Sequence, residues 1–167
     1  MNSPAAGKIR GQTKAGGRGL ARLAAVQALY QCETTGQTPA AVIAEFRVHR
    51  LGAEIDGTRY GEADAVFFAD LVEKTLARCD DIDPRIEEAL SGGWTVARLE
   101  TILRAILRLG TAELLYVPEV PAKVVIDEYV DLAHAFFDGG EPGLVNGVLD
   151  RLAREIRNDL GRLGDGS

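Results

Sequence analysis

The chain has few of the residues that build disulfides, metal sites or catalytic nucleophiles. It contains two cysteines and two histidines. Cys32 and Cys79 form no CxxC pair, and His49 and His134 have no ligand set nearby, so we expect reduced thiols and no metal. No phosphate-binding glycine loop, HExxH motif, GxSxG motif or plausible triad is present. These absences favour a binding protein that needs no cofactor over an enzyme.

Long apolar runs are also missing. None approaches the roughly 18 residues that a membrane-spanning helix needs. The basic N-terminal segment lacks the apolar core of a secretory signal. Hydrophobic residues make up 46% of the chain and charged residues 26%, which is ordinary for a water-soluble domain. We therefore expect a cytoplasmic protein with no membrane partner.

Acidic residues are absent from one end of the chain. Residues 1–32 carry five lysines and arginines and no acid, whereas the whole chain has a net charge of −6. The remainder is therefore strongly acidic and should repel phosphate, so any nucleic-acid contact should be local, and the basic end is the first candidate. Residues 1–19 are glycine-rich with almost no large apolar side chain. They predict a flexible basic arm, because such a segment buries too little surface to offset its ordering entropy. The alternative is a solvated tail with no task.

Strand-like alternation is missing as well, and helical spacing takes its place. Apolar residues recur at three- and four-residue steps, which places them on one face of a helix. Proline and glycine mark the ends, with Gly52–Gly61 expected as a loop and Ser91-Gly92-Gly93 as a break. The pattern predicts an all-α protein of about seven helices: Leu20–Cys32, a helix capped by Thr38-Pro39, a third around Val66–Leu76, a short one from Asp83-Pro84 to Leu90, Leu99–Tyr116, Val120–Phe137 and Glu141–Arg157.

Single residues within these segments carry further expectations. Trp94 precedes Thr95, a candidate cap for the Leu99 helix, so we expect its ring to pack back onto that helix. The alternative is that an RNA base stacks on the ring. Arg104 and Arg108 are four residues apart and predict a small cationic stripe. Gly147 lies inside an apolar helical pattern, which favours a close approach between two helices.

Several of these segments resemble the NusB family of bacterial transcription antitermination factors. The resemblance runs from about Arg18 to Arg157. Its most specific parts are the motifs AVQALYQ (Ala25–Gln31) and VNGVLD (Val145–Asp150), and ILRAILRLGTAELLY and VPAKVVIDEYVDLAHAFF lie between them. The resemblance implies two packed helical bundles divided near Gly92-Gly93. The segments would be an arm over 1–19, an N-terminal bundle over 20–92 and a C-terminal bundle over 93–163.

The resemblance also implies a function. A protein of this family binds single-stranded RNA of the boxA type together with the ribosomal small-subunit protein NusE. The complex acts on RNA polymerase to suppress termination in ribosomal RNA operons. The implied RNA-binding residues are Lys14, Arg18, Arg22 and Arg104, which would contact phosphates and so position the strand without specifying its sequence.

The chain departs from the family pattern at three places. The usual dense arginine cluster is thinned to Arg18 and Arg22, and Gly143-Leu144 replaces the Lys-Phe pair common before VNGVLD. Leu103 stands where many relatives have a polar residue.

Two alternative functions remain open on the sequence. One is the NusB-like RNA-binding domain of an RNA cytosine methyltransferase, which would require a catalytic domain beyond Ser167. The other is a protein-interaction module whose acidic helix faces bind a basic partner without RNA. Measuring RNA binding with and without the partner separates the second from the main interpretation.

Overall fold

The computed structural model describes residues 17–51, 54–55, 58–59 and 64–157. Within those ranges the protein is built from helices, as the apolar spacing predicted, and its strands are one two-residue antiparallel pair. That pair lies in the segment expected to be a loop. The elements are α1 (Gly17–Thr35), α2 (Pro39–His49), β1 (Glu54–Ile55), β2 (Thr58–Arg59), α3 (Ala65–Ala77), α4 (Cys79–Ala89), the 3₁₀ turn η2 (Val96–Arg98), α5 (Thr101–Tyr116), α6 (Ala122–Phe136) and α7 (Glu141–Ile156).

The chain divides into two compact units, one up to Leu76 and one from Ala77 onward. The division expected from the family resemblance was near Gly92-Gly93 instead. The glycines do break the helical pattern, and both have positive φ. However, α4 packs against α5 and α7, and so it belongs with the second unit. A local break in helix propensity is therefore not a break in packing.

The first unit shows the local signals that the sequence predicted. Gly36 follows α1 at φ +75°, a backbone region that suits glycine. Thr38 caps α2, because its side chain accepts a hydrogen bond from the N–H of Ala41 at 3.1 Å, and Pro39 occupies the first turn. The Phe46 and Phe68 rings, fully buried, stack 5.5 Å apart and join α2 to α3. Aromatic packing thus holds this unit together.

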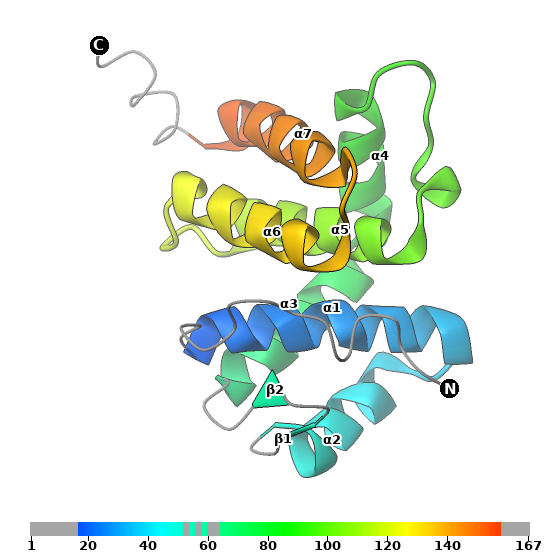
Figure 1. Cartoon of the computed structure of the whole chain (residues 1–167), viewed down its shortest axis with the longest axis vertical. Coiled ribbons are helices and arrows are strands. Elements are labelled where there is room, and N and C mark those ends of the chain that lie inside the picture. Colours follow the sequence, from blue (N-terminus) through cyan, green and yellow to red (C-terminus); the bar gives the residue numbers. More distant parts are fainter. Residues whose placement is uncertain (1–16, 52–53, 56–57, 60–63, 158–167) are drawn as a thin grey trace. The chain divides into compact units, whose positions relative to one another are not determined.

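In the second unit α5, α6 and α7 pack against one another in all three pairings, and α4 adds to α5 and α7 (Figure 1). These helices approach one another closely at Gly110 of α5. A Cβ atom there would meet Leu149 Cδ1 of α7 at 2.8 Å and Tyr129 Cδ2 of α6 at 3.4 Å. Gly110 therefore permits the three helices to meet. The prediction for Gly147 was wrong, since Gly147 is exposed and a Cβ there would meet nothing within 4 Å.

Several helix starts differ from the prediction. Helix α1 begins at Gly17, so residues 17–19 of the predicted arm are helical, and residues 1–16 of that arm lie outside the described residues. Helix α4 begins at Cys79 and contains Pro84 in its interior, because the fully buried Ile82 and Ile86 anchor it on both sides of the proline. Helix α5 begins at Thr101. Its cap is Glu100, whose carboxylate accepts from the N–H groups of Ile102 at 3.0 Å and Leu103 at 3.1 Å. Thr95, the predicted cap, instead precedes the separate turn η2.

Alanine should have opposite effects at Gly110 and Gly147. Gly147→Ala should raise the free energy of unfolding by about 0.5–1 kcal/mol, because alanine is the better helix former and the site is open. Gly110→Ala should lower it by about 1 kcal/mol, since overpacking outweighs the gain in propensity. Chemical denaturation of the two variants checks this. Stabilisation by both substitutions would contradict the close approach at Gly110.

Candidate nucleic-acid interface

Two of the predicted RNA-binding cations lie together at the start of α1. The Arg18 guanidinium lies 4.5 Å from the centroid of the Phe67 ring, and the Arg22 guanidinium lies 5.3 Å from it. The start of α1 is tied to the start of α3, because Asp64 N–H donates to the Gly17 carbonyl at 2.9 Å. Both arginines therefore lie on one face of α1. The two side chains differ in exposure, since Arg18 is exposed and Arg22 is only 3% exposed.

That difference divides the roles that the two arginines can take. Each guanidinium near a ring face gains a cation–π attraction. A buried guanidinium supports the packing of α1 on Phe67, whereas an exposed one can also meet a phosphate in solvent. The sequence could not separate these roles, because Phe67 lies far along the chain. Lys14, the third predicted cation of this end, lies outside the described residues.

Arg104, the fourth predicted cation, is used within the second unit. Its Nη1 donates to the backbone carbonyls of Leu99 at 2.7 Å and Val96 at 3.1 Å. These carbonyls belong to η2 and the residue that ends it, so the guanidinium fastens the turn that leads into α5. Arg104 is therefore a half-buried structural donor in this state of the protein.

The predicted stripe of Arg104 and Arg108 does not face a ligand as a pair. Arg108 donates through Nε and Nη2 to the two carboxylate oxygens of Asp83 at 2.8 and 2.7 Å. This fork-to-fork pairing joins α5 to α4 and uses the geometry in which arginine binds carboxylates best. The spacing correctly placed both arginines on one helix. Within the protein, however, Arg108 donates to Asp83, and Arg104 donates to the carbonyls of the turn η2 and of Leu99.

Sequence reasoning placed Trp94 in the core, and the structure contradicts this. The Trp94 side chain is 48% exposed, and among the described residues it is the one aromatic in the set of exposed large apolar side chains. Arg98 lies with its guanidinium 4.9 Å from the ring centroid. The three-residue turn η2 separates Trp94 from α5, so the ring does not fold back onto that helix as a staple would. The ring is therefore accessible to solvent, as the alternative of base stacking requires.

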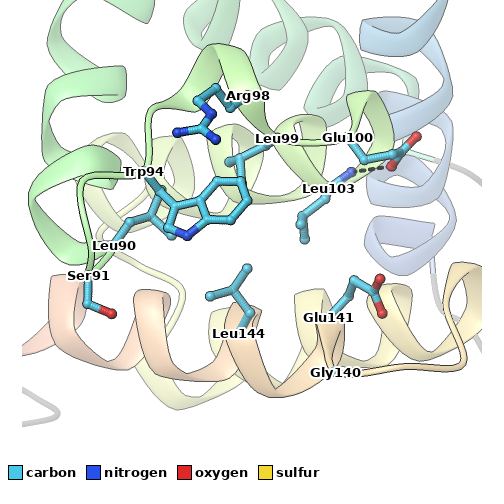
Figure 2. Close-up of a pocket in the computed structure, with 10 residues that line it drawn as sticks. All are labelled: Leu90, Ser91, Trp94, Arg98, Leu99, Glu100, Leu103, Gly140, Glu141 and Leu144. Carbon is cyan, nitrogen blue, oxygen red and sulfur yellow. Dashed lines mark hydrogen bonds between the residues drawn. The ribbon is translucent and has the colours of Figure 1, made fainter.

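Trp94 borders a groove of about 430 Å³ in the second unit. Its walls come from the segment after α4, from η2 and the start of α5, and from the first turn of α7; they include Leu90, Trp94, Leu99, Leu103, Glu141 and Leu144. Figure 2 shows the indole between Arg98 and Leu144, with Glu100 and Glu141 at the other end. Leu90, Leu99 and Leu103 are buried, whereas Leu144 is 37% exposed. Sequence reasoning missed Arg98, and the signal that could have found it is its position four residues after Trp94.

Other chemistry has little support in the described ranges. Burial raises the pKa of the Cys32 thiol, and burial is also the main cause of the raised pKa of Cys79. Both thiols therefore stay protonated near neutral pH, which does not suit a nucleophile. The described residues contain no cluster of three or more potential metal-ligating side chains. No helix in those same ranges is long and apolar enough to cross a membrane.

Comparison with known proteins gives consistent matches. The sequence profile of the NusB family matches residues 20–154. A protein of Bradyrhizobium sp. strain ORS 278, named transcription antitermination protein NusB, is 51% identical over 160 residues, which is 95% of each chain. A protein of Rhizobium rhizogenes with the same name is 49% identical over 142 residues, covering 85% of this chain and 89% of the relative.

Solved structures show the same fold. A structure of NusB from T. maritima has a TM-score of 0.70 at 26% identity, covering 87% of this chain and 96% of that one. A crystal structure of the antitermination factors NusB and NusE in complex with double-stranded RNA gives a TM-score of 0.68 at 28% identity. It covers 83% of this chain and 96% of the matched chain. The mainly helical architecture is thus shared with a protein whose structure was solved together with NusE and RNA.

Proposed function

The chain belongs to the NusB family, and from that membership we propose that it is a transcription antitermination factor that binds RNA jointly with the ribosomal protein NusE. The observation that carries the proposal is similarity over nearly the whole length to proteins named for antitermination. The solved complex of NusB, NusE and RNA supports the choice of partner. The role is that of a binding protein and not of an enzyme.

We propose further that the RNA is a single-stranded element of the boxA type and that the complex acts on RNA polymerase in ribosomal RNA operons. Such a protein works in the cytoplasm, where transcription takes place. The RNA in the solved complex is described as double-stranded. Single-stranded and duplex forms of one boxA-like sequence therefore belong in the same experiment, and tighter binding of the duplex would refute the single-stranded assignment.

Of the four proposed cations, Arg18 has the geometry that best fits a phosphate contact, because it is exposed at the basic end of α1. Lys14 would add a second contact from the same end. Arg22 is proposed to hold Arg18 in place through the shared Phe67 ring. Arg104 is proposed to act through η2, whose carbonyls it fastens.

Arg18→Ala should weaken binding to all RNA sequences alike by a few-fold, because phosphate contacts carry no sequence information. If about three phosphates are neutralised, the log–log salt slope should be near −2, from about −0.7 per contact on a single strand. The variant should make that slope shallower by about 0.7. Fluorescence anisotropy of labelled RNA at several salt concentrations measures both effects. Arg47→Ala, which removes an exposed cation from α2, is the matched control.

The test of joint binding is a titration of one boxA-like RNA with this protein, with NusE and with their mixture. NusE should raise the affinity of this protein for RNA by about tenfold or more. RNA must then tighten the protein–protein pair by the same factor, because coupling between two ligands is reciprocal. Equal affinity for the mixture and for the better single component would refute joint binding. Binding of NusE without any RNA binding would favour the interaction-module alternative.

The methyltransferase alternative has less support. The relatives matched over most of their own length are named for antitermination and not for methyl transfer. The chain spans 95% of the Bradyrhizobium relative. Similarity of this extent favours the antitermination function.

A further inference from the structure

An arginine binds a phosphate more tightly when its side chain is already held in place. The side chain is long, and fixing it at the moment of binding reduces affinity. We propose that Phe67 is a positioning residue of the RNA site, whose ring holds the Arg18 guanidinium at the start of α1 before RNA arrives. This inference rests on the proposed RNA-binding function and adds to it a residue that acts on RNA only through Arg18.

The first reason is the contact between the ring and the exposed cation. Phe67 lies in the first turn of α3 and is 8% exposed, and the Arg18 guanidinium lies 4.5 Å from the centroid of its ring. A guanidinium within about 6 Å of a ring centroid is attracted by the quadrupole of the ring. A ring contact orients a cation but, unlike an ion pair, does not neutralise it. The ring can therefore place the charge of Arg18 for a phosphate.

The second reason is that a buried cation shares the same ring. The Arg22 guanidinium lies 5.3 Å from the Phe67 centroid, and Arg22 is 3% exposed. Arg22 follows Arg18 by four residues, so one turn of α1 presents both cations to the ring. The buried guanidinium keeps the ring against α1, and the exposed guanidinium at the helix start uses it.

The third reason is the pair of hydrogen bonds that joins α3 to α1 beside this ring. The N–H of Asp64 donates to the carbonyl of Gly17, the residue before Arg18, at 2.9 Å. The Asp64 carboxylate accepts from the Phe67 N–H at 2.9 Å and so caps α3. Asp64 therefore contacts both the residue that precedes the cation and the residue that carries the ring. The backbone holds the two side chains in register.

A positioning residue and a contact residue differ in their effect on the salt dependence of binding. The log–log salt slope reports how many phosphates the protein neutralises. Arg18→Ala removes a charge and should make the slope shallower. Replacing the Phe67 ring leaves that charge in the protein, so affinity should fall while the slope stays the same.

The test is Phe67→Leu in the full-length protein, titrated with a labelled boxA-like single-stranded RNA at several salt concentrations. Affinity should fall by about three- to tenfold, which corresponds to the ordering of one long side chain on binding. The salt slope should keep its wild-type value. Phe67→Tyr keeps an aromatic face and should retain most of the affinity. In an Arg18→Ala background, Phe67→Leu should weaken binding no further, because both substitutions act through one contact.

Phe68→Leu is the matched control. Phe68 is the next residue of α3, and its ring is fully buried and stacked on Phe46. Its replacement should lower the melting temperature at least as much as Phe67→Leu does, because a fully buried ring is lost. It should leave the RNA affinity of the folded protein unchanged. Circular dichroism melting of each variant sets a titration temperature at which that variant is folded.

The outcomes separate this inference from the function on which it rests. RNA binding that Phe67→Leu does not weaken would overturn the positioning role and leave the proposed function standing. Equal weakening by Phe68→Leu would show that the effect comes from the stability of the first unit, which also overturns the inference. A shallower slope for Phe67→Leu would contradict positioning as well. If neither this protein nor its mixture with NusE binds RNA, both proposals fail.

Discussion

Arg157→Ala should lower the free energy of unfolding by on the order of 3 kcal/mol, the largest effect expected for a side chain that is not apolar. The Arg157 guanidinium donates to four backbone carbonyls around the end of α5 and the turn before α6. The acceptors are Leu114 at 2.8 Å, Val120 at 2.8 Å, Val117 at 3.0 Å and Glu113 at 3.2 Å. Carbonyls at a helix C-terminus carry partial negative charge, so a cation placed among them is favourable. A hydrogen bond to a charged group contributes about 1.5–3 kcal/mol when it is considered alone. The four bonds of Arg157 share one side chain, so their contributions do not simply add.

The size of the effect separates this role from that of an ordinary surface charge. Arg154→Ala is the matched control, because Arg154 lies three residues before Arg157, in the last turn of α7, and pairs with Asp150 at the surface. Its removal should change stability by less than about 0.5 kcal/mol. Arg157→Lys should recover only part of the lost stability. The planar guanidinium reaches four carbonyls through three nitrogens, whereas a lysine ammonium has a single nitrogen. Equal stability of the Arg157→Ala and Arg154→Ala variants in urea denaturation would contradict the fastening role.

Tyr129→Phe should lower the free energy of unfolding by about 2 kcal/mol. The Tyr129 hydroxyl donates to Oε1 of Glu113 at 2.6 Å, and both residues are fully buried between α5 and α6. Removing the hydroxyl deprives a buried carboxyl group of a donor, and a group left under-satisfied in a dry interior costs more than the bond contributed. Chemical denaturation monitored by circular dichroism measures the change.

Two variants test whether that cost depends on burial and on the pair. Tyr116→Phe removes a hydroxyl that donates to Asp81 at 3.0 Å at the surface, and it should change stability by about 0.5 kcal/mol or less. In a double-mutant cycle, Tyr129→Phe should cost less when Glu113→Gln is already present, because the two groups share one interaction. Strict additivity of the two substitutions would show that the pair is not coupled.

The helices of this protein are determined by signals that lie close together in the sequence. Thr38-Pro39 supplies a cap and a first-turn proline, Gly36 supplies a positive φ, and both operate over a few residues. The three-to-four-residue recurrence of apolar positions in α5, α6 and α7 likewise depends only on helix geometry. The fold class, most helix bounds and the family resemblance could therefore be predicted without coordinates.

The tertiary structure alone decided what the polar and solvent-facing groups do. Periodicity tells which face of a helix is apolar, but it does not tell which distant groups reach that face. Arg108 meets Asp83 25 positions away, and Arg157 meets the Leu114 carbonyl 43 positions away. Gly110 and Gly147 are both helical glycines, yet only Gly110 faces neighbouring side chains. Trp94 is exposed because η2 lies between it and α5. Which contact such a side chain makes depends on the packing of the whole chain, and local sequence signals do not determine it.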